Sequence, residues 1–198
     1  MTTAKSINTR KLVLLALLTA IVVVLQLLGA FIRFGPFSIS LVLLPIAVGA
    51  ALIGIYAGGW LGLVFGFVVL LSGDAGLFMA VDPLATVLVV LLKGVLAGLA
   101  AGAVYKLFAE KSRTVASIIA AIVCPIVNTG IFVLGCFLFF LPTLTEWGEA
   151  AGFASVTAFI FLGMISLNFL FELGLNIILS PAIVRLIQYG QDKRGITA

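Results

Sequence analysis

Five polar residues interrupt otherwise apolar stretches of the chain, and they are the residues best suited to bind a solute. They are Lys93, Asn128, Asn168, Glu172 and Asn176. The last three recur every four residues, so they share one face of a helix. An ammonium, a carboxylate and several amides can together bind the anionic, hydroxyl and amide groups of a small polar molecule. The pattern predicts a binding site for such a molecule.

The sequence lacks the residue combinations on which most catalytic centres depend. It contains no His, and therefore no Ser/His or Cys/His pair, and no phosphate-binding Gly-Lys-Ser/Thr motif. Its two cysteines, Cys124 and Cys136, lie in one apolar segment without CxxC spacing. We therefore predict no enzymatic activity, no metal and no cofactor.

Composition indicates a membrane protein. The chain is 64% hydrophobic and 9% charged, with a mean hydropathy of +1.38, whereas a soluble domain has about a quarter of its residues charged. The net charge of +4 is explained by basic residues that flank apolar segments, not by nucleic-acid binding. We predict one all-α transmembrane domain over residues 12–187, between an N-terminal segment 1–11 and a tail 188–198.

Six membrane spans fit the apolar segments. The first is too long for the hydrophobic region of a cleavable signal, so we expect a transmembrane helix there. The second and third are at or below the usual lower limit of about 17 residues, and they form either two spans or one re-entrant or broken unit. The predicted spans are 12–32, 39–55, 60–71, 84–108, 115–141 and 156–187, with a tight turn at 56–59 and outer loops at 72–83 and 142–155.

Basic residues predict the orientation of the bundle. Nine of the 11 basic residues form three clusters that apolar segments of membrane-spanning length separate: Lys5/Arg10/Lys11, Lys106/Lys111/Arg113 and Arg185/Lys193/Arg194. Since basic residues that flank spans stay in the cytoplasm, both termini are predicted to be cytoplasmic. The opposite loops then carry Arg33, Asp74, Asp82, Glu146 and Glu149 and are net acidic.

Lys93, Asn128 and Glu172 are predicted to lie near the middle of three different spans. An ionisable group at that depth costs at least about 2.5–3.5 kcal/mol unless it faces protein or a cavity. Three interpretations remain open: a structural Lys93–Glu172 ion pair, a ligand cavity, or a proton or ion relay. Gln26 and Thr129 extend the polar surface, and Arg33 and Trp147 in the outer loops are further candidates for substrate contact.

Small residues recur at helical spacing and predict close helix packing. Gly58, Gly62 and Gly66 form one set, and Gly94, Gly98 and Gly102 form another. For both sets we predict contacts within the chain. Ala16 and Ala20 show the same spacing in the first span, and for them an intramolecular and an intermolecular contact remain equally open.

Three stretches resemble a known family. They are 37–50 (FSISLVLLPIAVGA), 55–62 (IYAGGWLG) and 168–185 (NFLFELGLNIILSPAIVR). Together with the length and the six-span layout, they resemble the substrate-binding S components of energy-coupling factor (ECF) vitamin transporters. The resemblance extends over essentially the whole chain, through loose hydrophobic motifs.

The resemblance implies a function and partners. An S component of the bacterial cell membrane binds a vitamin at a site that opens to the outside beneath the outer loops. It associates with a membrane coupling subunit and two cytoplasmic ATPases, then reorients to release the vitamin inside. An Ala-x-x-x-Ala motif in the first span packs on the coupling subunit, and Ala16 and Ala20 match that motif.

Several vitamins fit the predicted binding site. A central Lys93 with amide partners suits pantothenate, and the chain is similar to pantothenate-type S components. Riboflavin, folate and cobalamin remain alternatives; a flat vitamin requires stacking aromatics, whereas most of the 16 phenylalanines are expected to face lipid. Outside this family, the alternatives are a stand-alone facilitator, which needs a continuous polar path, and a membrane scaffold without a ligand.

Overall fold

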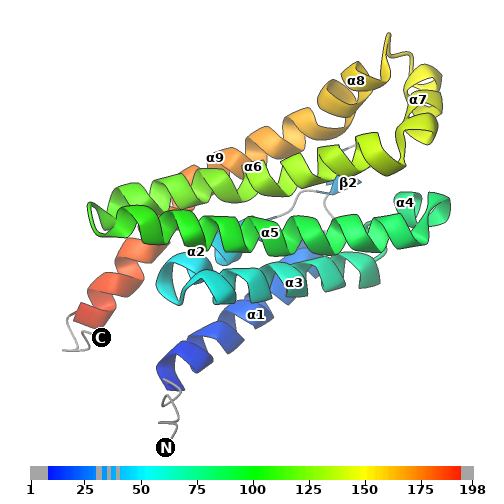
Figure 1. The fold of residues 1–198 in the computed structure, drawn as a ribbon. Coiled ribbons are helices and arrows are strands. Elements are labelled where there is room, and N and C mark those ends of the chain that lie inside the picture. Colours follow the sequence, from blue (N-terminus) through cyan, green and yellow to red (C-terminus); the bar gives the residue numbers. More distant parts are fainter. Residues whose placement is uncertain (1–8, 30–32, 35–36, 39–40, 193–198) are drawn as a thin grey trace, which may run out of the picture.

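Helices account for nearly all of the chain that the structure describes. The computed structural model describes residues 9–29, 33–34, 37–38 and 41–192. The long helices in these ranges are α1 (Thr9–Gly29), α3 (Ile55–Leu71), α5 (Pro83–Ala109), α6 (Arg113–Phe139) and α9 (Ser166–Asp192). The shorter helices are α2 (Leu43–Leu52), α4 (Gly76–Val81), α7 (Leu141–Ala150) and α8 (Val156–Ala158), and a π-helical turn at Phe159–Ile165 joins α8 to α9. A two-residue hairpin, β1 (Arg33–Phe34) with β2 (Phe37–Ser38), is the one extended element described. The predicted all-α class is confirmed (Figure 1).

Four of the described helices are long and apolar enough to cross a membrane. They lie at Thr9–Gly29, Pro83–Ala109, Arg113–Phe139 and Asn168–Arg185. They correspond to the predicted first, fourth, fifth and sixth spans. The count of six spans remains a prediction, because α2 and α3 are shorter.

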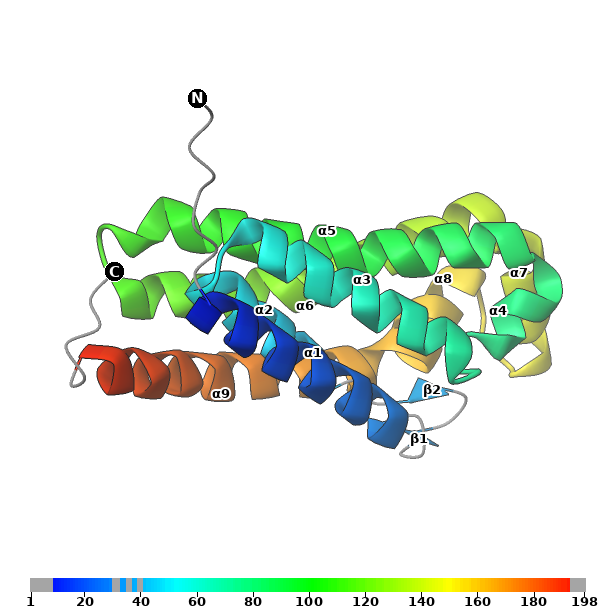
Figure 2. The same cartoon turned by 90° about the horizontal axis from the view of Figure 1, so that it is seen from below.

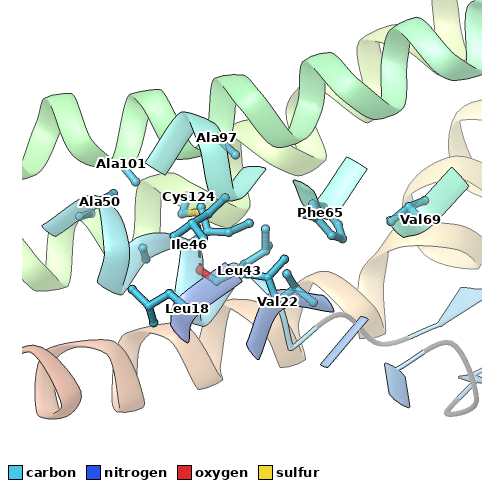
Figure 3. Close-up of a cluster of buried hydrophobic side chains, with 14 of the residues drawn as sticks. Leu18, Val22, Leu43, Ile46, Ala50, Phe65, Val69, Ala97, Ala101 and Cys124 are labelled. Carbon is cyan, nitrogen blue, oxygen red and sulfur yellow. Dashed lines mark hydrogen bonds between the residues drawn. The ribbon is translucent and has the colours of Figure 1, made fainter. Parts of the chain in front are cut away.

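The predicted second span, 39–55, is wrong in length within the described residues. Its helix, α2, has only ten residues, and seven of them are buried. Figure 3 shows Leu43, Ile46 and Ala50 of α2 among side chains from other helices. Since α2 packs against α1, α3, α5, α6 and α9, it forms part of the protein core and has little surface to present to lipid.

The turn predicted at 56–59 is also wrong, because these residues form the first turn of α3. The chain instead turns at Gly54, whose φ of 132° lies in a region that favours glycine. The predicted outer loops 72–83 and 142–155 contain the helices α4 and α7. The glycine and proline residues in these segments were interpreted as loop signals, but they lie at the boundaries of short helices.

Capping residues set where the two central helices begin. The Asp82 side chain accepts a hydrogen bond from the Ala85 N–H at 3.0 Å, and Pro83 occupies the first turn of α5. Ser112 accepts from the Val115 N–H at 3.4 Å at the start of α6. Side-chain oxygens at the N-cap satisfy amides that have no partner within the helix. Local sequence thus fixes the beginning of α5, and with it the third-turn position of Lys93.

The glycine sets bring the backbones of α3 and α5 into contact. A Cβ atom added at Gly62 would overlap the Gly94 carbonyl oxygen, and one added at Gly94 would overlap the Gly62 carbonyl oxygen. Gly58 and Gly98 have the same reciprocal relation. The predicted intramolecular role of the glycines is confirmed.

The two ends of the bundle differ in what they contain. The beginning of α1, the turn between α5 and α6 and the end of α9 lie at one end (Figures 1 and 2). The helices α4 and α7 lie at the opposite end. This arrangement is the one expected if the three basic clusters share one side of the membrane, and their cytoplasmic placement remains a prediction.

Replacing Gly62 with alanine should destabilise the protein by about 1–3 kcal/mol, the usual cost of overpacking. The added methyl group meets rigid backbone, so α3 and α5 must separate. Gly130→Ala is the matched control, because a Cβ there meets no atom within 4 Å and alanine favours helix. Thermal unfolding in detergent should show a lower Tm for Gly62→Ala and an unchanged or higher Tm for Gly130→Ala. Equal Tm values would contradict the close contact.

Candidate functional site

A cavity of about 130 Å³ lies among α1, α3, α5, α6 and α9. A single ordered water needs only about 10–15 Å³, so the cavity has room for a small organic molecule. Most of its lining comes from the later turns of α1, α3 and α6 and from the earlier turns of α5 and α9, and the rest comes from α4 and the turn before it, from Phe140 and from the π-helical turn. These are the halves nearest to α4 and α7, so the cavity lies toward that end of the bundle.

Four of the predicted binding residues line this cavity: Lys93 from α5, Asn128 from α6, and Asn168 and Glu172 from α9. Asn128 and Glu172 are each only 7% exposed. Thr129, which was expected to extend the polar surface, also lines the cavity. Polar residues separated by up to 79 positions in the sequence therefore converge on one space inside the bundle.

The structure places Asn176 and Trp147 elsewhere. Asn176 is buried, its amide donates to the Glu172 backbone carbonyl at 2.9 Å, and it accepts from the Ser180 hydroxyl at 3.5 Å. It is not among the residues that line the cavity. Trp147 in α7 packs edge-on against the cavity-lining ring of Phe78, with centroids 5.9 Å apart. Arg33 belongs to β1, and its side chain lies outside the described part of the structure.

Asp74 is a cavity residue that sequence reasoning placed in an outer loop. It follows Gly73, whose φ of 76° lets the chain turn between α3 and α4. The Asp74 carboxylate lines the cavity and accepts a hydrogen bond from the Gln26 side-chain amide at 3.0 Å. Gln26 was the available signal, because an amide in an apolar span needs a buried partner.

Five phenylalanines also line the cavity, although phenylalanines were expected to face mainly lipid: Phe65, Phe78, Phe132, Phe140 and Phe169. The Phe78 ring meets those of Phe132 and Phe140 edge to face, with centroid distances of 5.5 and 4.9 Å. The wall toward α4 and α7 is therefore aromatic.

The Lys93 ammonium lies against aromatic rings. Its Nζ atom is 5.6 Å from the centroid of Phe65 and 5.3 Å from that of Phe132. Both distances fall within the range of cation–π attraction. Glu172 and, more weakly, Asp74 also attract this ammonium electrostatically. Burial removes water from this ammonium, and the aromatic faces and the two carboxylates offset part of that cost.

Two buried acceptor atoms have no hydrogen-bond partner among the described residues: Gln26 Oε1 and Asn128 Oδ1. Both residues line the cavity. A buried polar atom without a hydrogen-bond partner destabilises the fold by about 1–3 kcal/mol. Such atoms are therefore rare unless a ligand or an ordered water binds them, or the local structure is strained. A molecule that enters the cavity with N–H or O–H groups would remove this cost.

A double-mutant cycle should detect the Gln26–Asp74 hydrogen bond. We expect the destabilisation by Gln26→Ala and by Asp74→Ala to be non-additive by about 1 kcal/mol, because either change alone removes the same bond. The free energy of unfolding in detergent gives the coupling. The control cycle pairs Gln26→Ala with Asp82→Ala at the α5 cap and should be additive. An additive Gln26–Asp74 cycle would show that the contact contributes nothing.

The comparison with known proteins agrees with this architecture. The family model described as "ECF transporter, substrate-specific component" matches residues 10–184, which include every residue that lines the cavity. No curated protein matches the chain. Because the family match extends over most of the chain, this protein belongs to the family of substrate-specific components of ECF transporters and is a membrane transport subunit, not a catalyst.

Proposed function

We propose that the cavity is the site at which this subunit captures a small vitamin from outside the cell. The observation that carries the proposal is the convergence of Lys93, Asn128, Asn168 and Glu172, from three helices, on one cavity. Such groups are costly inside a membrane protein and usually mark a substrate pathway. A capture subunit uses them to replace the water that a polar solute loses on entry.

The position of the cavity supports capture from the outside. It lies in the half of the bundle near α4 and α7, away from the end that carries the basic residues Lys106, Arg113 and Arg185. Basic residues that flank spans favour the cytoplasmic side. We therefore propose cytoplasmic termini and a cavity that faces outward, in a bundle that crosses the membrane six times with α2 as the shortest crossing.

The inner half of the bundle favours a capture subunit over a facilitator. There Ile46 of α2 packs among apolar residues such as Leu18 and Ala101, which are buried with it in one hydrophobic cluster. A facilitator needs polar groups along its whole path, and this cluster interrupts such a path. Release into the cell then requires partners that reorient the subunit.

We propose that α1 provides the contact with a membrane coupling subunit, which in turn binds two cytoplasmic ATPases. Ala16 and Ala20 are exposed on α1, next to the exposed side chains of Val13, Leu17 and Val24. The opposite face of α1 is buried within the chain. Small residues between larger apolar ones let a second helix approach closely, so this exposed face fits an intermolecular helix contact.

Lys93→Met should abolish solute binding and leave the fold intact if Lys93 serves the ligand. Lys106→Met is the matched control, because Lys106 lies on the same helix in its exposed last turn. Native mass spectrometry in mild detergent against pantothenate, riboflavin, folate, cobalamin and further B vitamins should show one stoichiometric adduct. We expect that adduct with the wild type and Lys106→Met, and not with Lys93→Met.

Two results would count against the cavity as a capture site. If Lys93→Met unfolds and Lys106→Met does not, Lys93 and Glu172 form a structural ion pair. If the wild type is monodisperse and binds no solute of the panel, the polar cluster is better explained as the assembly surface of a scaffold.

Bulky substitutions on α1 should separate capture from coupling. We expect Ala16→Trp and Ala20→Trp to prevent co-purification with the coupling subunit and the ATPases, because indole rings keep the partner helix at a distance. Solute binding by the isolated subunit should be unchanged. Ala182→Trp, at an exposed position of α9, is the control and should retain the partners. Retention of the complex by both α1 variants would place the contact elsewhere.

A further inference from the structure

We infer that Gln26 of α1 contacts the solute directly. Its side-chain oxygen accepts a hydrogen bond from an N–H or O–H group of the solute, and Asp74 is the positioning residue that orients the Gln26 amide for this contact. The inference rests on the proposed function and adds a specificity-determining residue to that site. The sequence indicated only that Gln26 extends the polar surface.

Gln26 is one of the most deeply buried polar side chains in the described part of the chain. It is 1% exposed and lies near the end of α1, with leucine residues before and after it. An amide in such surroundings destabilises the fold unless both its donor and its acceptor have partners. Because Gln26 lines the cavity, a molecule bound in the cavity can supply a missing partner.

The nitrogen of the Gln26 amide has a partner among the described residues, and the oxygen has none. The Nε2 atom donates to Asp74 Oδ2 at 3.0 Å, whereas Oε1 is buried without a hydrogen bond. An ionised carboxylate only accepts hydrogen bonds, so turning the amide over would place two acceptors against each other. Asp74 therefore holds Gln26 in the orientation that leaves its oxygen for a donor from elsewhere.

Asn128 provides a second acceptor in the same cavity lining. Its Oδ1 atom is also buried without a partner among the described residues, and the side chain comes from α6. A solute with two N–H or O–H groups can satisfy both oxygens, whatever its charge. Neither oxygen is open to water, so side chains of the lining must adjust as the solute binds.

A purely structural role for Gln26 predicts a different response to changes in the solute. The hydrogen bond to Asp74 joins α1 to the turn before α4 and uses only the N–H group of the amide. A residue with that role alone affects every solute to the same degree. A residue that accepts from the solute affects one particular donor group, and this difference can be measured.

Methylated solutes combined with Gln26→Met test the contact. Titration calorimetry of the full chain in detergent compares pantothenate with its two mono-O-methyl ethers and its N-methyl amide. It also compares riboflavin with its N3-methyl and mono-O-methyl analogues. For the vitamin that binds, we expect one analogue to bind the wild type about tenfold more weakly, because Oε1 loses its donor. In Gln26→Met this difference should largely disappear, since methionine has a similar length but no acceptor of that kind.

Thr19→Val is the matched control for this comparison. Thr19 is a polar residue of the same helix that accepts from the Trp60 indole, and it is not part of the cavity lining. It should keep the full effect of methylation, because the bulk of the added methyl group is the same in every variant. If Gln26→Met does not fold, Gln26→Asn replaces it: the amide remains, but its oxygen is withdrawn by one methylene group.

Asp74→Asn tests the positioning role. An asparagine at this position can donate to Gln26 as well as accept from it, so the Gln26 amide is no longer held in one orientation. We expect the effect of methylation to fall well below its wild-type value. Asp82→Asn, which changes the cap of α5 and not the cavity lining, should preserve that effect.

The possible results distinguish this inference from the proposed function. If a vitamin binds but no methylated analogue is weakened, or if Gln26→Met leaves the weakening unchanged, Gln26 does not contact the solute while solute capture stands. If Asp74→Asn preserves the full effect of methylation, the positioning role of Asp74 is wrong. If the wild type binds no vitamin, the proposed capture function fails and this inference fails with it.

Discussion

Polar side chains inside an apolar helix bundle can find hydrogen bonds and opposite charges only in one another or in a ligand. Lipid offers neither, and water is scarce there. Each polar group therefore destabilises the bundle by a few kcal/mol unless it has a hydrogen-bond partner or an opposite charge. In this protein the constraint draws Lys93, Asp74, Glu172, Gln26 and Asn128 to one cavity. The position of the cavity, the directions of the helix faces and the chemistry of the site all follow from that convergence.

The fold meets this constraint by filling one half of the bundle and leaving space in the other. Contact between the glycine faces of α3 and α5 holds these two helices together, and the short α2 fills the centre of the inner half with apolar side chains. Toward α4 and α7 no comparable helix among the described residues occupies the centre, and aromatic rings line the remaining space. Close packing and the cavity are thus two consequences of the same unequal helix lengths.

The folded structure gives Lys93 neighbours that the sequence did not predict. Considered along the sequence, Lys93 faces one carboxylate and is available to an anion, which favours pantothenate. In three dimensions Asp74 joins the site through the turn at Gly73 and the hydrogen bond to Gln26, and Phe65 and Phe132, which were expected to face lipid, lie against Lys93. Asp74 therefore adds a second carboxylate to the cavity lining, beside Glu172.

The sequence by itself determined the membrane class, the long apolar helices, the glycine contact and four of the polar residues at the cavity. These depend on composition and on spacing along one helix, which local sequence contains. Only the tertiary structure decided that α2 is a short core helix, that Asp74 turns inward and that five phenylalanines face the cavity. In an almost uniformly apolar chain, hydrophobicity does not distinguish a side that faces lipid from one that faces protein. That distinction arises only when the helices pack and each side chain acquires its neighbours.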